Sequence, residues 1–232
     1  MNFLYSNIPW LPLTKIFLLM KKFLLVVAVL VIALCGAWYF GLFKGKDRPG
    51  GPKPEGLTVS KHSSGFNESM SNAMNSYYIL TESFVNWDTA KINSSLAELK
   101  TSMDSLPIHE MEKDSAIYPT VQGQWESIKA EIIGMQADTA LYDKKEDLNM
   151  LSQQLFDLLR IVKFDAAKVY YQECPMALNN YESSAFWLST EGDNKKRRNP
   201  YLGLHDPKYG KAMLTCGATR DSINYVTSPA GN

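Results

Sequence analysis

Four sulfur-containing side chains in the C-terminal part of the sequence are spaced so that they can act in pairs. Cys174 and Met176 stand two residues apart in "ECPMAL", and Met213 and Cys216 stand three apart in "KAMLTCG". Residues i and i+2 of an extended chain point to one face, and residues i and i+3 of a helical turn do the same. Pro175 disfavours helical geometry at the residue before it, so we expect the first pair in an extended segment. Each pair therefore presents two sulfur atoms together.

Sulfur pairs of this kind have two chemical uses, and spacing alone leaves both open. Thiolate and thioether ligands bind soft ions, above all Cu(I), and thiolates also bind Zn(II). Alternatively, Cys174 and Cys216 form a disulfide across the intervening loop, which contributes roughly 3 to 4 kcal/mol to stability in the chain-entropy model. A disulfide removes both thiolates from the ligand set. The sequence therefore predicts either a copper site, with zinc as the alternative metal, or a covalent fastening.

Four segments between Phe66 and Val162 have apolar residues at alternating spacings of three and four, which is typical of amphipathic helices. Asp88 is an N-cap candidate in the connection "NWDTA", and Pro107 ends the second segment. The apolar positions are Phe66, Met70, Ala73, Tyr77, Leu80 and Phe84; Ile92, Leu96, Leu99, Met103 and Leu106; Tyr118, Val121, Trp125, Ile128, Ile132 and Met135; and Leu148, Leu151, Leu155, Leu158 and Val162. Short connections place consecutive helices side by side. We therefore expect an all-α fold, an antiparallel four-helix up-and-down bundle followed by an irregular C-terminal tail that contains the Cys and Met residues.

An uncharged apolar run from residue 23 to residue 43 precedes the bundle. At about 1.5 Å rise per residue, a run of about 21 residues spans a hydrocarbon core of roughly 30 Å. We expect one N-terminal transmembrane helix here, because aromatic residues continue to Phe43 where a cleaved signal peptide would end in small residues. A cleaved signal and lipidation at Cys35 are the alternatives. Residues 44–65 are rich in Gly, Pro, Ser and charge and are expected to form a flexible tether.

These segments predict the organisation of the whole chain. Residues 1–22 form a cytoplasmic leader, within which Met20 of "MKKFLLVV" is an alternative start. The folded helical domain covers 66–220, and 221–232 is a disordered tail. Because a short leader before a first apolar segment normally stays in the cytoplasm, we expect the folded domain on the other side of the membrane.

Composition and motifs disfavour several classes of function. The 24 Lys and Arg residues balance the 24 Asp and Glu residues in this chain of 232. With no net field and no basic stripe with interleaved aromatics, nucleic acid is not an expected partner. The sequence also lacks a Gly-rich phosphate loop, an H-E-x-x-H motif and a nucleophile elbow, and it has only three histidines for acid-base chemistry. We therefore do not expect an enzyme.

Four short motifs together resemble a bacterial domain of unknown function. They are "CPMA" at 174–177, "WLS" at 187–189, "NPYLG" at 199–203 and "MLTCG" at 213–217, in the order and spacing of that family. The family occurs in membrane-anchored or secreted proteins and is fused to periplasmic adaptor subunits of heavy-metal efflux pumps of the resistance-nodulation-division class. "CPM" also resembles the start of the heavy-metal-binding motif "YTCPMHP", although Ala177 replaces its histidine.

The resemblance implies a domain in the periplasm of a bacterial cell envelope, anchored once in the inner membrane, that handles copper or other heavy metals. It implies Cys174, Met176, Met213 and Cys216 as metal ligands, and His205 between them as a nitrogen ligand for Cu(II) or Zn(II). Expected partners are heavy-metal efflux components, other envelope proteins and the membrane itself. Two functions stay open: a metal buffer or efflux accessory, and a structural or interaction module whose tail is fastened by a Cys174–Cys216 disulfide.

Overall fold

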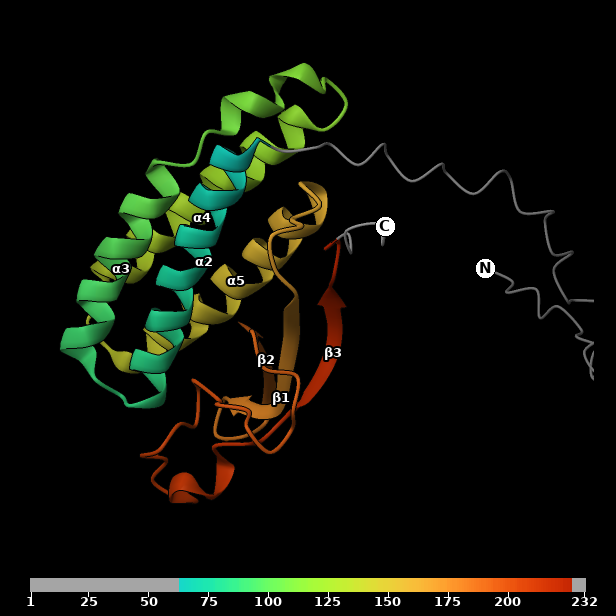
Figure 1. Cartoon of the computed structure of the whole chain (residues 1–232). Helices are drawn as coiled ribbons and strands as arrows, with labels where there is room; N and C mark the ends of the chain where they lie inside the picture. The colour runs from blue at the N-terminus through green and yellow to red at the C-terminus, as the bar shows by residue number, and fades with distance from the viewer. Residues whose placement is uncertain (1–62, 227–232) are drawn as a thin grey trace, which may run out of the picture. The chain divides into compact units, whose positions relative to one another are not determined.

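The four predicted helices are present in the computed structural model, which describes residues 63–226 (Figure 1). Consecutive helices pack side by side. Their apolar stripes form the core, in which all the predicted positions are buried except the partly buried Tyr118 and Trp125. The helices are α2 (Ser64–Val85), α3 (Thr89–Asp104), α4 (Tyr118–Ala137) and α5 (Leu141–Ile161), with a short 3-10 helix η1 (Ile108–Lys113) between α3 and α4.

Local signals set where two of these helices begin. Asp88 caps α3 as predicted, because its carboxylate accepts the backbone N–H of Lys91 at 2.9 Å. Ser63 caps α2 in the same way, accepting the N–H of Phe66 at 3.0 Å. Each cap satisfies one backbone donor that has no partner within its helix.

The prediction of an all-α fold is wrong. The segment expected to be an irregular tail contains three strands, β1 (Val169–Leu178), β2 (Ser183–Ser189) and β3 (Ala218–Ile223), which form an antiparallel sheet in the order β2-β1-β3 (Figure 1). The β-branched and aromatic residues of "VYYQEC" indicate an extended chain. The sequence does not show that this segment is the central strand, because β3 lies far along the chain and pairs with it only in the folded protein.

A chain of hydrogen bonds joins the sheet to the helices. The backbone N–H of Leu188 donates to the Tyr77 hydroxyl at 3.0 Å, and that hydroxyl lies 2.7 Å from the Ser152 hydroxyl. Ser152 in turn donates to the Leu148 carbonyl at 2.6 Å. Since Tyr77 is on α2 and Ser152 on α5, one buried phenol connects two helices to the outer edge of β2. The sheet therefore has a fixed position on the bundle.

The "CPM" motif lies at an irregularity of β1. Cys174 pairs with Ala185, and regular pairing resumes only where Leu178 meets Ser183. Pro175 fits this interruption, because proline has no N–H to donate to a neighbouring strand. Cys174 is fully buried and Pro175 is exposed. The strand thus carries the cysteine into the core immediately before its pairing is interrupted.

The predicted transmembrane helix at 23–43 and the leader before it lie outside the described residues, as does nearly all of the tether. Within residues 63–226, no helix has both the length and the apolar character that a membrane crossing requires. At the other end, β3 continues to Ile223 and so includes the first residues of the predicted disordered tail, 221–232.

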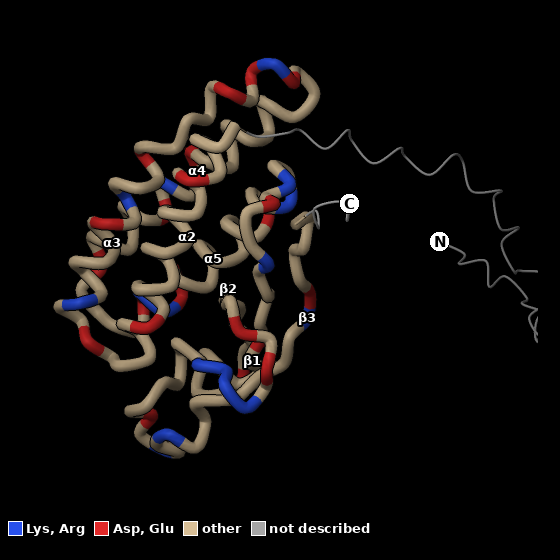
Figure 2. The backbone as a smooth tube through the Cα atoms, in the orientation of Figure 1, with Lys and Arg blue, Asp and Glu red and all other residues tan. Residues whose placement is uncertain are grey.

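Charged residues are mixed over the described elements, and basic and acidic positions are interspersed along the helices (Figure 2). The ion pair of Lys129 with Asp104, at 2.6 Å, has partly exposed side chains. The pair of Arg198 with Glu82, at 2.5 Å, is more exposed still. Such pairs each contribute at most about 1 kcal/mol. Burial of the apolar stripes therefore provides most of the stability of the bundle.

Gly203 allows the C-terminal segment to contact the end of α2. The next residue, Leu204, donates its backbone N–H to the Val85 carbonyl at 2.9 Å. Gly203 has a φ of 58°, and a Cβ atom there would lie 2.4 Å from the Val85 oxygen. Only glycine combines this positive φ with so close an approach of two backbones.

We expect Gly203→Ala to lower the free energy of unfolding by about 2 to 4 kcal/mol, from backbone strain plus the clash with Val85. Gly210→Ala is the matched control, because Gly210 has a similar φ of 54° but open space where a Cβ would lie. It should cost only about 1 kcal/mol. Urea unfolding of both variants measures the difference, and equal losses would show that the close approach at Gly203 is unimportant.

Candidate functional site

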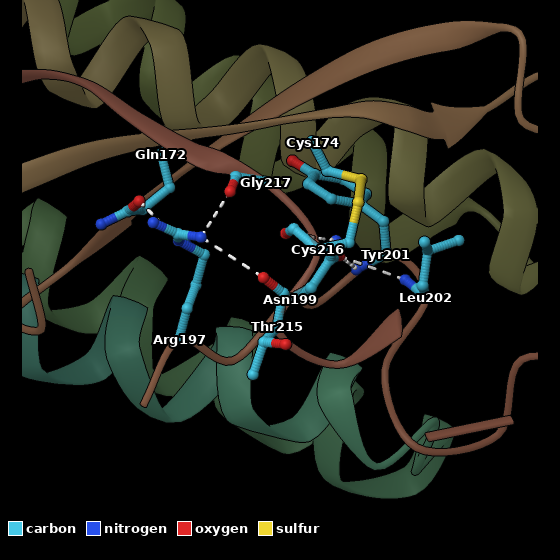
Figure 3. Close-up of a disulfide and its surroundings, with 9 residues drawn as sticks. All are labelled: Gln172, Cys174, Arg197, Asn199, Tyr201, Leu202, Thr215, Cys216 and Gly217. Carbon is cyan, nitrogen blue, oxygen red and sulfur yellow. Dashed lines mark hydrogen bonds between the residues drawn. A yellow bond between two sulfur atoms is a disulfide. The ribbon is translucent and has the colours of Figure 1, made fainter. Parts of the chain in front are cut away.

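The two predicted ligand cysteines, Cys174 and Cys216, are joined in a disulfide (Figure 3). Cys174 belongs to β1, and Cys216 lies two residues before β3. Antiparallel pairing of Glu173 with Ala218 brings the two segments together, and the Cα atoms of the cysteines are 5.7 Å apart. Both sulfur atoms are therefore used in a covalent bond, which is the second of the two uses that their spacing allowed.

The other three predicted ligands have different surroundings. Met176 and Met213 are partly buried and pack against the apolar core. His205 is exposed and lies beside Trp87, with the ring centroids 6.4 Å apart. In the part of the chain that the structure describes, no group of three or more His, Cys, Asp or Glu side chains is placed to hold a metal ion. The structure thus brings together two of the five predicted ligands.

A buried arginine, Arg197, fastens the chain around the disulfide. Its side chain is only 2% exposed, and it donates to Gln172 Oε1 at 2.9 Å and to the carbonyls of Thr215 and Gly217. Figure 3 shows the guanidinium group between Gln172 and Gly217. Burial lowers the pKa of Arg197, but a guanidinium stays charged in proteins. This cation is therefore held by neutral oxygens from both sides of the disulfide.

Asn199 makes a second set of bonds from the same turn. Its Oδ1 accepts the backbone N–H groups of Tyr201, at 2.8 Å, and Leu202, at 3.2 Å. Its Nδ2 donates to the Cys216 carbonyl at 3.3 Å. The side chain is fully buried, so these bonds satisfy groups that water does not reach.

The motifs that resemble the heavy-metal-associated family thus have structural roles here. Besides Asn199 and the cysteines, Tyr201 is buried and its hydroxyl donates to the Phe186 carbonyl on β2. Gly217 has a φ of 125°, and a Cβ there would lie 2.3 Å from the Glu173 oxygen. These residues are needed to close the C-terminal segment onto the sheet, whatever the segment binds.

A cavity of about 120 Å³ lies where this segment meets the first turns of α5. It was not predicted from the sequence. One wall comes from the helices and their connections, and the other from the β1–β2 turn and the segment after Asn199. The lining residues are Trp87, Tyr142, Lys145, Ala177, Leu178, Asn179, Asn180, Tyr181, Tyr201, Leu202 and Asp206.

Lys145 and Asp206 are the two charged residues that line this cavity, and neither forms an ion pair within the part of the chain that the structure describes. The Lys145 side chain is 8% exposed, and its ammonium group lies over the ring of Trp87, 3.7 Å from the centroid. Burial lowers its pKa to about 8, and the charge of Asp206 opposes this effect. Within residues 63–226, the Lys145 ammonium forms no ion pair and no hydrogen bond.

Asp206 is close enough to influence Lys145 but is already engaged. Its Oδ1 accepts the backbone N–H groups of Lys208, at 3.0 Å, and Tyr209, at 2.7 Å. The Tyr181 hydroxyl donates to the same carboxylate, 3.0 Å from Oδ2. The carboxylate therefore shapes the loop and does not neutralise the lysine by direct contact.

The backbone around the cavity is unusual. Trp87, Asn179, Asn180 and Tyr181 all have positive φ values and line the cavity, and of the other described non-glycine residues only Lys163 shares this feature. Each such residue outside glycine costs of order 1 kcal/mol or more, so the surrounding structure must hold it in place. The indole Nε1 of Trp87 is also buried and has no hydrogen-bond acceptor within residues 63–226.

Sequence reasoning missed this site because its residues have ordinary local contexts. Lys145 stands in "DKKEDL", which reads as a solvated helix face, and Trp87 stands in a connection that reads as a turn. The only local signal is the pair Asn179 and Asn180, because asparagine tolerates positive φ. Burial of Lys145 depends on packing against the segment around Asp206, which lies about sixty residues further along the chain.

A larger groove lies along α2 and its connection to the start of α3, with a volume of about 670 Å³. The exposed Ile79 and the partly buried Tyr78 give it an apolar floor, and Asp88 and Lys91 add charges at one end. Aromatic and aliphatic groups with a polar rim are typical of protein-binding surfaces. The remaining lining residues are Asn75, Glu82, Ser83 and Asn86.

We expect Arg197→Met to lower the free energy of unfolding by about 3 kcal/mol or more, because it removes at once the buried guanidinium donors to the oxygens of Gln172, Asn194, Thr215 and Gly217. The neighbouring Arg198→Met is the matched control, since it removes only an exposed pair and should cost less than about 1 kcal/mol. Urea unfolding compares the two variants. Similar small losses in both would mean that Arg197 does not fasten the segment.

We expect the Lys145 amine to titrate near pH 8, well below the exposed lysines, in NMR spectra of the chain labelled at lysine Cε. Asp206→Asn keeps the hydrogen-bond acceptor but removes the negative charge, so it should lower the pKa of Lys145 further. Between pH 8 and the usual lysine pKa of 10.5 the unfolded chain binds more protons, so this group should make stability rise with pH over that window. Titration of Lys145 together with the exposed lysines would contradict its burial.

In comparisons with known proteins, no family model matches this chain, and neither a curated protein nor a solved structure is significantly similar to it. The resemblance to a heavy-metal-associated family therefore stays a prediction from the four motifs.

Proposed function

We propose that this chain is a binding module of an oxidising compartment, in which a disulfide fastens the C-terminal segment to the helical bundle. The Cys174–Cys216 bond is the observation that carries the proposal. Disulfides form and persist outside the reducing cytosol, so the bond supports a location beyond the cytoplasmic membrane. This agrees with the transmembrane anchor predicted at 23–43.

The disulfide favours an interaction module over a copper buffer. Copper(I) binding by Cys174 and Cys216 requires free thiolates, and the bond removes both of them. Two of the hollows formed by residues 63–226 suit binding instead: the groove along α2 and its connection to α3, and the cavity at Lys145. Envelope proteins, with heavy-metal efflux components first among them, stay the predicted partners.

The decisive measurement is the intact mass of the chain before and after thiol alkylation without reductant. The chain is produced with copper in a host that exports it, and Cys35→Ser is introduced so that any alkylation reports on Cys174 and Cys216 alone. We expect a mass lower by two hydrogens than the reduced chain, no alkylation and no bound copper. Changing both Cys174 and Cys216 to serine should lower the free energy of unfolding by roughly 3 to 4 kcal/mol.

Two alkylated thiols with one bound copper would contradict the proposal and support the metal module. Loss of that copper in a Cys174→Ser variant would identify the thiolate ligand. A Met176→Leu variant is the control for the alkylation and mass measurement, because it removes a predicted metal ligand and leaves the disulfide intact.

A further inference from the structure

We infer that the cavity at Lys145 binds a small monocarboxylate group, with the Lys145 ammonium as its counter-ion. The inference rests on the proposed binding function, because it names a ligand class for one of the two proposed binding hollows. It is carried by a cation on a largely buried side chain that lines a cavity and has no hydrogen-bond acceptor among residues 63–226.

The Lys145 ammonium has no acceptor among the described residues. A lysine ammonium has three N–H donors, and a buried charge is costly unless it is paired and hydrogen-bonded. The face of Trp87 compensates for part of this cost by a cation–π interaction at 3.7 Å. The indole ring, however, offers no oxygen acceptor for a hydrogen bond from any of the three N–H donors. The described residues supply no oxygen acceptor for these donors, and Nζ is not fully buried, so an oxygen-bearing ligand in the cavity can take the place of water there.

The carboxylate of Asp206 limits the charge of a ligand in this cavity. Asp206 is a neighbouring carboxylate that raises the pKa of Lys145 without forming an ion pair with it. Asp206 repels any anion, and it repels a doubly charged phosphate more strongly than a ligand with one negative charge. Glu146 also lies near the rim, within 3.3 Å of the Tyr142 hydroxyl. Beside these two carboxylates, a monoanion paired with the Lys145 ammonium is therefore favoured over a dianion.

The cavity is small and partly apolar. A volume of about 120 Å³ holds roughly four to eight water-sized groups, at roughly 15 to 30 Å³ each. The side chains of Ala177, Leu178 and Leu202 line the cavity with apolar surface. A carboxylate attached to a short aliphatic chain fits both the volume and the lining. A free short-chain acid and the C-terminus of a partner peptide share this chemistry.

Hydrogen bonds hold the backbone on the side of the cavity formed by the β1–β2 turn. The successive positive φ values of Asn179, Asn180 and Tyr181 form a left-handed turn, which the Glu182 N–H closes by donating to the Leu178 carbonyl at 3.1 Å. The Tyr142 hydroxyl donates to Asn179 Oδ1 at 2.7 Å and ties this turn to α5. The wall opposite Lys145 is therefore preorganised, which reduces the entropy cost of binding.

The test is an NMR titration of the oxidised full chain in an uncharged detergent, with labels on lysine Cε and on the tryptophan indole groups. The probes are butyrate, N-acetyl-glycyl-valine with a free terminal carboxylate, and the same peptide with a C-terminal amide. We expect saturable shifts of Lys145 and Trp87 with the carboxylates and none with the amide. Because an added negative charge favours the ammonium, saturation should also raise the pKa of Lys145.

Lys145→Met keeps the length of the side chain but not its charge, and should weaken carboxylate binding at least about tenfold, as read from Trp87. Lys129→Met is the matched control, because Lys129 also lies over a tryptophan, Trp125, at 4.2 Å but outside the cavity. It should leave binding unchanged. In the unmodified chain, affinity should fall as the pH rises through about 8.

The outcomes separate cleanly. If butyrate and the peptide acid both bind, a free short-chain acid is sufficient as a ligand. If the peptide acid alone binds, the ligand is the C-terminus of a partner peptide. No saturable shift up to tens of millimolar, equal binding of the amide, or equal binding by Lys145→Met would overturn the inference. The wild-type pH series decides the question even where Lys145→Met fails to fold. Because the intact mass of the same sample reports the disulfide, failure of the proposed module and failure of carboxylate binding are different results.

Discussion

The bond between Cys174 and Cys216 is the constraint on which the C-terminal half of the structure depends. It closes a loop across a sequence separation of 42 that contains β2, the turn at Arg197 and Asn199, and the wall of the Lys145 cavity. Closing a loop removes conformations from the unfolded chain, so segments with little apolar surface can still be ordered. The strands are short and β3 is mostly exposed, which makes this covalent link more important than it would be in a large sheet.

Two of the three buried cations of residues 63–226, Arg197 and Lys145, show how the same fold serves structure and binding. The donors of Arg197 meet oxygens of Gln172, Asn194, Thr215 and Gly217, so this residue is a satisfied part of the framework. Lys145 is almost as deeply buried but, among the described residues, has only the face of Trp87 beneath it. A satisfied cation holds segments together, whereas an unsatisfied one beside a cavity is suited to a ligand. The difference lies in the acceptors and not in the residue type.

The family-like motifs acquire a physical meaning from this framework. Gly217, the glycine of "MLTCG", lets the backbone come close to the Glu173 carbonyl. Asn199, the asparagine of "NPYLG", donates a hydrogen bond to the Cys216 carbonyl. These requirements are geometric and would be the same for a domain that binds copper and for one that binds a carboxylate. Motifs of this kind therefore predict a shared fold better than a shared ligand.

The sequence by itself determined the four helices, because their apolar period of 3.6 and signals such as the Asp88 cap act within a few residues. It also determined that Cys174 lies in an extended segment, since Pro175 restricts its neighbour. It left open whether the cysteines bind metal or each other, and it gave the wrong fold class. Only the tertiary structure decided these points and revealed the cavity, because the pairing of β1 with β3 and the burial of Lys145 depend on contacts between residues far apart in the chain.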